Sequence, residues 1–170
     1  TLGLGEKPKS LPRPNPQGKV NPLLLAFASG YTWIARGYAY DVKGLKELIK
    51  EGIAHRGLAF LHVLQPCPTY NDLHTKEWFA PRLYRLEEEG YDPLVPPGLP
   101  PEALEARMAR FQQKALEWGE RIPVGVFWKA ELPTFEARLK AYLPRYPEAY
   151  PARGPETPLD LEGLLQEFAL

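Results

Sequence analysis

The stretch YTWIARGYAYDVKGLKELIKEGIAHRGLAFLHVL, residues 31–64, decides the fold of this chain. Its first part, 31–38, is rich in aromatic and β-branched residues and predicts a strand. From Asp41 to Gly57, apolar residues recur at helical spacing between an aspartate N-cap and a terminal glycine, which predicts an amphipathic helix. The last part, 58–64, is a near-continuous apolar run, typical of a strand covered on both faces. Strand, helix and strand of this kind form a right-handed βαβ unit, so we expect a parallel sheet.

The segment after the second predicted strand, QPCPTYND at 65–72, lies where parallel sheets place their functional groups, beyond the carboxyl ends of the strands. It contains Cys67, the only cysteine of the chain. A lone cysteine in this position is more often an inert packing residue than a ligand. However, Pro66 and Pro68 remove two backbone donors and fix the backbone direction on both sides of the thiol. A [4Fe–4S] cluster needs four cysteines, so a cluster here would need three from elsewhere.

Proline-rich segments flank the predicted βαβ unit, and they divide the chain into three regions. Residues 1–20 predict an extended arm. Residues 21–76 are the α/β region, in which Asn21 caps a short helix at 22–28. Residues 77–170 predict an irregular, mostly helical extension. We expect the proline-rich arms to wrap a larger body or a partner, because they bury little surface of their own.

Within the extension we expect a helix that contains Trp78, Leu83, Leu86 and 87–89, and then a long helix at 102–119. A strand at 122–128 and a helix from Thr134 follow. The chain is then predicted to form a proline-rich arm at 143–158 and a terminal helix at 159–169. Trp33 and Trp128 are predicted to pack in the interior.

Composition excludes several classes of partner. Lysine plus arginine equals aspartate plus glutamate, 21 each, which gives no electrostatic argument for nucleic acid or an anionic membrane. No apolar run approaches the roughly 18–20 residues that span a bilayer, and no secretory signal pattern is present. A single cysteine excludes an internal disulfide and fits a reducing compartment, so a cytoplasmic location is expected. The chain opens with Thr1, which favours removal of an upstream part.

The run from Asn21 to Asp72 is similar to the last βαβ portion of the diphosphate-binding domain in the beta subunits of 2-oxoacid:ferredoxin oxidoreductases. The resemblance lies in an NP helix start, an aromatic strand ending near Arg-Gly, a DVK helix start and a VLQPC-T-N loop. TKEWF at 75–79 and IPVGVFWKAELPTFEARL at 122–139 resemble the C-terminal tail of the same family. The resemblance implies an α/β fold, the parallel-sheet portion of a thiamine-diphosphate-binding domain, and it implies that Cys67 is the fourth ligand of a [4Fe–4S] cluster.

The resemblance also implies an activity, which is oxidative decarboxylation of a 2-oxoacid of the pyruvate or 2-oxoglutarate type to an acyl-CoA, with electrons passed to ferredoxin. The implied cofactors are thiamine diphosphate, Mg²⁺ and the cluster, and the implied partners are an alpha subunit, ferredoxin and coenzyme A in a hetero-oligomer. The family's paired N-terminal cysteines and its Gly-Asp-Gly metal-diphosphate motif do not occur in this sequence. We therefore expect the segment alone to bind no thiamine diphosphate tightly and to be inactive.

Other residues permit two interpretations. Asn71 is a candidate cofactor-binding residue whose amide could enter the pocket beside Cys67, but asparagine is equally common in turns. We interpret His62 as a core histidine, His55 as a partner of the helix dipole and His74 as a solvated loop residue, because their spacing does not suit a metal site. No catalytic residue is assigned.

Two alternative functions remain open. The chain could be a non-catalytic α/β interaction module whose proline-rich arms bind a partner. A thiol enzyme using Cys67 is disfavoured, because no histidine or acid is spaced to activate it.

Overall fold

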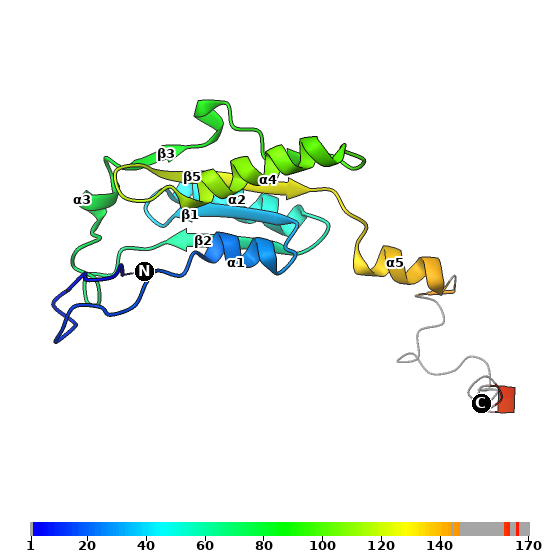
Figure 1. The fold of residues 1–170 in the computed structure, drawn as a ribbon, viewed down its shortest axis with the longest axis horizontal. Helices are drawn as coiled ribbons and strands as arrows, with labels where there is room; N and C mark the ends of the chain where they lie inside the picture. The colour runs from blue at the N-terminus through cyan, green and yellow to red at the C-terminus, as the bar shows by residue number, and fades with distance from the viewer. Residues whose placement is uncertain (1, 144, 147–161, 164–165, 167–170) are drawn as a thin grey trace. The chain divides into compact units, whose positions relative to one another are not determined.

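The computed structural model of this chain describes residues 2–143, 145–146, 162–163 and 166. The chain divides into two compact units at Leu132 and Pro133. Figure 1 shows the elements of the first unit. The predicted arm at 143–158 and the predicted terminal helix at 159–169 lie largely outside the described residues.

The predicted βαβ unit is present at the centre of the first unit. It consists of β1 (Trp33–Tyr38), α2 (Val42–Ala54) and β2 (Ala59–Leu64). The two strands are parallel and in register, and the Asp41 side chain caps α2 by accepting from the Gly44 N–H at 3.0 Å. A Cβ on Gly37 would lie 2.8 Å from Leu45 Cδ1, so a glycine in β1 is what lets α2 approach the sheet this closely.

The region after residue 76 adds three strands to the sheet, of which the sequence predicted only the one at 122–128. These strands are β3 (Leu83–Arg85), β4 (Leu94–Val95) and β5 (Ile122–Ala130). The sheet order is β2-β1-β5-β3, with β4 also paired to β5. β5 runs antiparallel to β1, whereas the other pairs are parallel, so the sheet is mixed and mostly parallel.

The helix predicted from Trp78 through residues 87–89 is wrong. Only α3 (Lys76–Phe79) is α-helical there, and it is followed by β3 and by a 3₁₀ turn, η1 (Glu87–Glu89). Pro81 has no backbone N–H with which to continue the helix. Leu83 to Arg85 pair instead with β5, and Gly90 ends the turn in the left-handed conformation at φ 68°.

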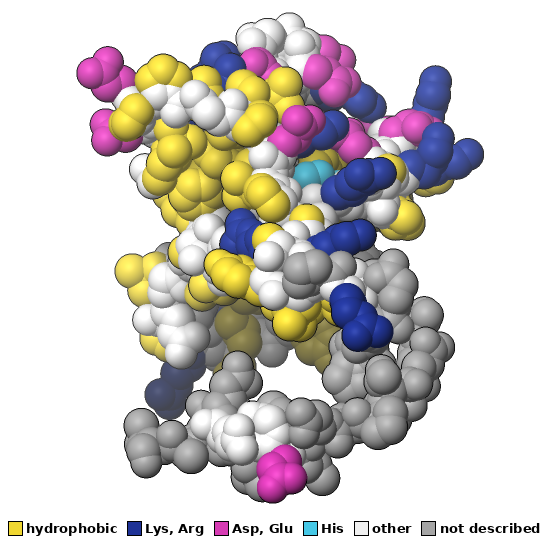
Figure 2. Space-filling model, turned by 90° about the vertical axis from the view of Figure 1, so that its right-hand side faces the viewer, with side chains coloured by type: hydrophobic (Ala, Val, Ile, Leu, Met, Phe, Trp, Pro, Cys, Tyr) yellow, Lys and Arg dark blue, Asp and Glu magenta, His cyan; other side chains and the backbone are white. Residues whose placement is uncertain are grey.

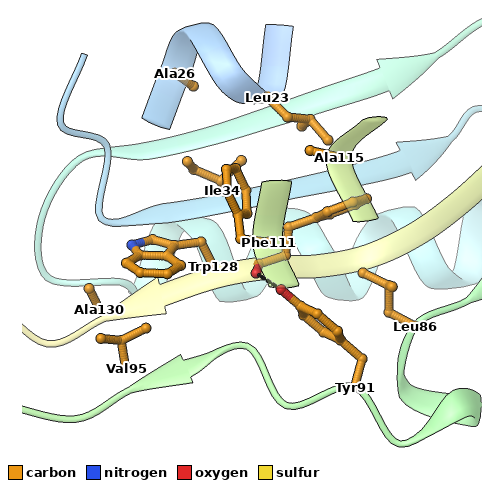
Figure 3. Packing of buried hydrophobic residues seen from close by; sticks show 11 residues of the cluster. Leu23, Ala26, Ile34, Leu86, Tyr91, Val95, Phe111, Ala115, Trp128 and Ala130 are labelled. Atoms are coloured by element: carbon orange, nitrogen blue, oxygen red, sulfur yellow. Dashed lines mark hydrogen bonds between the residues drawn. The ribbon is translucent and has the colours of Figure 1, made fainter. Parts of the chain in front are cut away.

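The main core lies on the face of the sheet opposite α2, under α1 (Pro22–Ala28) and α4 (Pro101–Leu116), as Figures 1 and 3 show. Phe111 of α4 is fully buried and stacks on Phe27 at 4.7 Å between ring centroids. Trp128 of β5 packs edge-on against both rings. The Tyr91 hydroxyl donates to the Phe127 carbonyl at 2.6 Å, drawn as a dashed line in Figure 3. The predicted burial of Trp33 and Trp128 is confirmed.

β2 is less buried than its apolar sequence predicts. It pairs only with β1 among the described residues, and Ala59 and Val63 are exposed. Val42 and Ile53 of α2 are exposed as well. Figure 2, which presents the right-hand side of the molecule in Figure 1, shows that hydrophobic side chains are also exposed there among charged ones. Because Ala59 and Val63 are exposed, the prediction of cover on both faces does not hold in this structure, and the single neighbour of β2 also leaves one of its edges unpaired.

The second unit contains α5 (Phe135–Tyr142), which begins as predicted after Thr134. The Thr134 hydroxyl accepts from the Ala137 N–H at 3.2 Å, as an N-cap does. No helix among the described residues is long and apolar enough to cross a membrane.

Candidate functional site

The loop after β2, residues 65–75, follows the carboxyl end of the parallel pair β1 and β2, as predicted. Cys67 lies in this loop, and its thiol is free and exposed. The Cys67 carbonyl accepts from the Tyr70 N–H at 3.1 Å and from the Asn71 N–H at 2.7 Å. The backbone of Cys67 is therefore held in a closed turn while its thiol stays accessible.

Asn71 lies in the same turn, and its side chain organises the loop. Its Oδ1 accepts from the backbone N–H groups of Leu73 and His74, at 3.2 and 3.1 Å. Its Nδ2 lies 3.0 Å from Nδ1 of His74. These bonds are those of a turn-forming asparagine, and a cofactor-binding role for Asn71 remains a prediction.

His74 is buried, with 5% of its surface exposed, so its interpretation as a solvated loop residue is wrong. Its ring packs on Trp78 at 4.3 Å between centroids, and its Nε2 lies 3.3 Å from Glu6 Oε1. Burial lowers the pKa of His74, while the Glu6 carboxylate acts in the opposite direction. Residue spacing offered no sign of this contact, because Glu6 belongs to a separate proline-rich segment.

The N-terminal arm lies against the Cys67 loop, whereas its sequence predicted an arm around a larger body or a partner. The Lys9 N–H donates to Asp72 Oδ1 at 2.9 Å, and the Ser10 hydroxyl donates to the Tyr70 carbonyl at 2.5 Å. Lys9 Nζ lies 3.7 Å from Asp72 Oδ2. Side chains and turn backbone thus supply the hydrogen bonds that prolines deny to regular structure.

A buried arginine, Arg36 of β1, lies beside His62 of β2. Only 2% of Arg36 is exposed, and burial lowers its pKa to about 10. Its Nε donates to His62 Nδ1 and its Nη1 donates to the Pro123 carbonyl, both at 3.4 Å. Its guanidinium carbon lies over the rings of Trp118 and Phe127, at 5.8 and 5.2 Å from the ring centroids. His62 is half-buried, and burial together with the Arg36 charge lowers its pKa to about 4.

The donor atoms of the described residues limit the metal chemistry of the site. No group of three or more histidine, cysteine, aspartate or glutamate side chains in the described ranges could hold a metal ion. The exposed Cys67 thiol fits one position of an iron–sulfur cluster, because a thiolate ligand must be accessible to iron. No cluster of three or more acidic side chains that would hold a divalent cation by itself lies among the described residues.

Comparison with known proteins defines the class. Residues 67–143 match the family model for the C-terminal part of the pyruvate ferredoxin oxidoreductase beta subunit. The chain is 56% identical over 155 residues to a 2-oxoacid:ferredoxin oxidoreductase subunit beta from Sulfolobus sp, and the match spans 90% of this chain and 50% of that protein. The protein of the same name from Saccharolobus solfataricus is 49% identical over 176 residues, which span 98% of this chain and 56% of that protein.

A solved structure shows the same fold. The chain is similar to a 2-oxoglutarate:ferredoxin oxidoreductase from Magnetococcus marinus, with a TM-score of 0.67 at 23% identity, over 99% of this chain and 51% of that one. This structural likeness shows the fold, whereas the family model and the two curated relatives confirm the resemblance inferred from the loop: the chain is a relative of the beta subunits of 2-oxoacid:ferredoxin oxidoreductases. It spans about half the length of the curated relatives that it matches.

Proposed function

We propose that this chain acts as the C-terminal part of the beta subunit of a 2-oxoacid:ferredoxin oxidoreductase, which oxidatively decarboxylates a 2-oxoacid of the pyruvate or 2-oxoglutarate type to an acyl-CoA and reduces ferredoxin. The observation that carries the proposal is the 56% identity to a protein of that name across 90% of the chain. This support favours the enzyme over a non-catalytic interaction module. A cytoplasmic location fits the single free thiol.

The proposed partners are an alpha subunit, in a hetero-oligomer, and ferredoxin, with coenzyme A as a substrate. When bound in the intact protein, thiamine diphosphate with Mg²⁺ supplies the carbon chemistry and a [4Fe–4S] cluster supplies one-electron transfer. In this proposal the residues of this chain bind and orient the cluster and do not themselves react with the substrate. The described residues contain no cluster of three or more metal-ligating side chains, and we assign neither the diphosphate nor its metal to particular residues of this segment.

Cys67 is the residue of this chain that we propose as a cluster ligand. Its thiolate would bind one iron, and the turn closed by the Tyr70 and Asn71 N–H groups would hold the backbone from which the thiolate extends. A nucleophilic role for Cys67 receives no support, because the nearest loop histidine, His74, has both ring nitrogens engaged by Asn71 and Glu6.

The test is substitution of Cys67 in the intact oxidoreductase. Cys67→Ala should leave folding largely unchanged, because an exposed loop thiol contributes little to the core. It should lower the bound iron and slow ferredoxin reduction more than decarboxylation, since the exit of electrons depends on the cluster. Ser29→Ala, at the exposed C-cap of α1, is a matched control for the loss of one small polar atom. Iron content and ferredoxin reduction equal to the unsubstituted protein would exclude Cys67 as a ligand.

A further inference from the structure

A set of hydrogen bonds connects the N-terminal arm to the backbone of Cys67 through two side chains. At one end, the Asn71 N–H donates to the Cys67 carbonyl at 2.7 Å. In the middle, Nδ2 of Asn71 lies within hydrogen-bonding distance of Nδ1 of His74, at 3.0 Å. At the other end, His74 meets the carboxylate of Glu6, which also accepts from the Gly3 N–H. Residues far apart in the sequence are joined in this way at one loop.

The hydrogen bonds determine the tautomer of His74. Asn71 Oδ1 already accepts two backbone N–H groups, from Leu73 and His74, so the amide oxygen is oriented toward the backbone. The group facing His74 Nδ1 is therefore the Asn71 NH₂, a donor, and Nδ1 must accept. The single ring proton of neutral His74 is then on Nε2, which points at Glu6 Oε1 at 3.3 Å. This assignment follows from the network and requires a neutral ring.

We propose that His74 is the positioning residue of the Cys67 loop, because it couples Glu6 of the arm to Asn71 and so fixes the direction in which the Cys67 side chain leaves the turn. The inference rests on the proposed role of Cys67 as a cluster ligand. A turn that is already ordered loses less conformational entropy when its thiolate binds a metal. His74 achieves this from a buried position against Trp78, without contacting the thiol itself.

The arm is the second support of the loop. Lys9 and Ser10 hold the outer side of the loop at Asp72 and Tyr70. Glu6 holds the inner side at His74, and Lys19 lies 3.8 Å from the same carboxylate. The loop is thus held on both sides by one proline-rich segment, whose stiff backbone limits the freedom of either contact.

The test uses the unique thiol of the chain. A nitroxide spin label attached to Cys67, the only cysteine, reports the motion of this turn by electron paramagnetic resonance. In the full chain we expect His74→Ala and Glu6→Ala to shorten the rotational correlation time of the label at least twofold. Glu6→Gln should change the spectrum much less than Glu6→Ala does, because its one amide oxygen still accepts from His74 Nε2 although the contact with the Gly3 N–H is lost. Spectra are compared well below each unfolding temperature, so a loss of global stability alone does not change them.

His55→Ala is the matched control. It removes a histidine whose ring lies 2.8 Å from the Thr32 hydroxyl, at the amino end of β1, whereas the Cys67 loop lies at the carboxyl end of the β1 and β2 pair. It should leave the label unchanged. An immobile label in both alanine variants, or a His55→Ala effect as large as that of His74→Ala, would overturn the proposal. If His74→Ala does not fold, the Glu6→Ala and Glu6→Gln pair decides the question.

A second measurement separates this inference from the proposed function. Iron content of the Cys67→Ala oxidoreductase tests the ligand role, whereas label mobility tests the positioning role. Loss of iron with an unchanged label in His74→Ala would reject the positioning role alone. A mobilised label with iron retained in Cys67→Ala would reject the ligand role and with it the functional reason for positioning.

Discussion

Removal of the His62 imidazole should reduce the amount by which the free energy of unfolding falls in acid. In the folded chain burial and the neighbouring Arg36 charge lower the pKa of His62 from 6.5 to about 4. Between these two values the unfolded chain binds a proton that the folded chain does not, so stability present above pH 6.5 is lost as the pH falls toward 4. Each pH unit in this window corresponds to about 1.4 kcal/mol, and the fall from pH 6.5 to pH 5 therefore removes up to about 2 kcal/mol.

The assay is urea unfolding followed by tryptophan fluorescence at pH 7 and pH 5. His62→Leu should lose up to about 2 kcal/mol less free energy of unfolding between these pH values than the unsubstituted chain does. Part of the acid sensitivity should remain, because burial also lowers the pKa values of His55 and His74. His55→Gln serves for comparison, because the pKa of this half-buried C-cap residue of α2 is lowered less than that of His62, so the substitution should reduce the loss in the same direction but by a smaller amount. An identical loss in His62→Leu and in the unsubstituted chain would refute the reasoning.

Three further predictions concern the core. Arg36→Met should raise the pKa of His62, measured by NMR titration. The pKa should stay below 6.5, because burial lowers it more than the Arg36 charge does, and an unchanged pKa in this variant would contradict the reasoning. Phe111→Ala should lower the free energy of unfolding in urea by about 3–5 kcal/mol, and Phe111→Leu by much less, since this ring is fully buried; equal losses would argue against the packing described. Tyr91→Phe should cost about 1–2 kcal/mol in the same assay by leaving the Phe127 carbonyl unpaired, and no change would mean that water replaces the hydroxyl.

The local patterns of the sequence predicted the βαβ unit well. A capping aspartate, helical spacing and a terminal glycine are short-range signals, and they placed α2 and the flanking strands within two residues of their observed bounds. They also placed the start of α4 within one residue, at 102 against the observed Pro101, and the start of α5 after Thr134. The loop with Cys67 was predicted for the same reason, because its place follows from the direction of β2.

Contacts between distant segments were not predictable from such patterns. β5 was recognised as a strand, but its antiparallel pairing with β1 depends on the path of the whole extension. β3 has only three residues, too few for periodicity to distinguish it from a helix. His74 looked solvated because polar residues surround it in sequence, while its burial comes from Trp78 and the arm. Arg36 drew no attention, since a charge within a strand is usually exposed.

The placement of β5 has a consequence for synthesis of the chain on the ribosome. β1 receives its first neighbour, β2, soon after it is made, but its second neighbour, near Trp128, follows Ile34 by roughly 90 residues, or about 5–20 s at ordinary rates of translation. During that interval one edge of an almost wholly apolar strand is unpaired, and such edges are where nascent chains associate wrongly. Slow elongation through residues 39–121 would therefore lower the yield of folded protein more than an equal delay after residue 130.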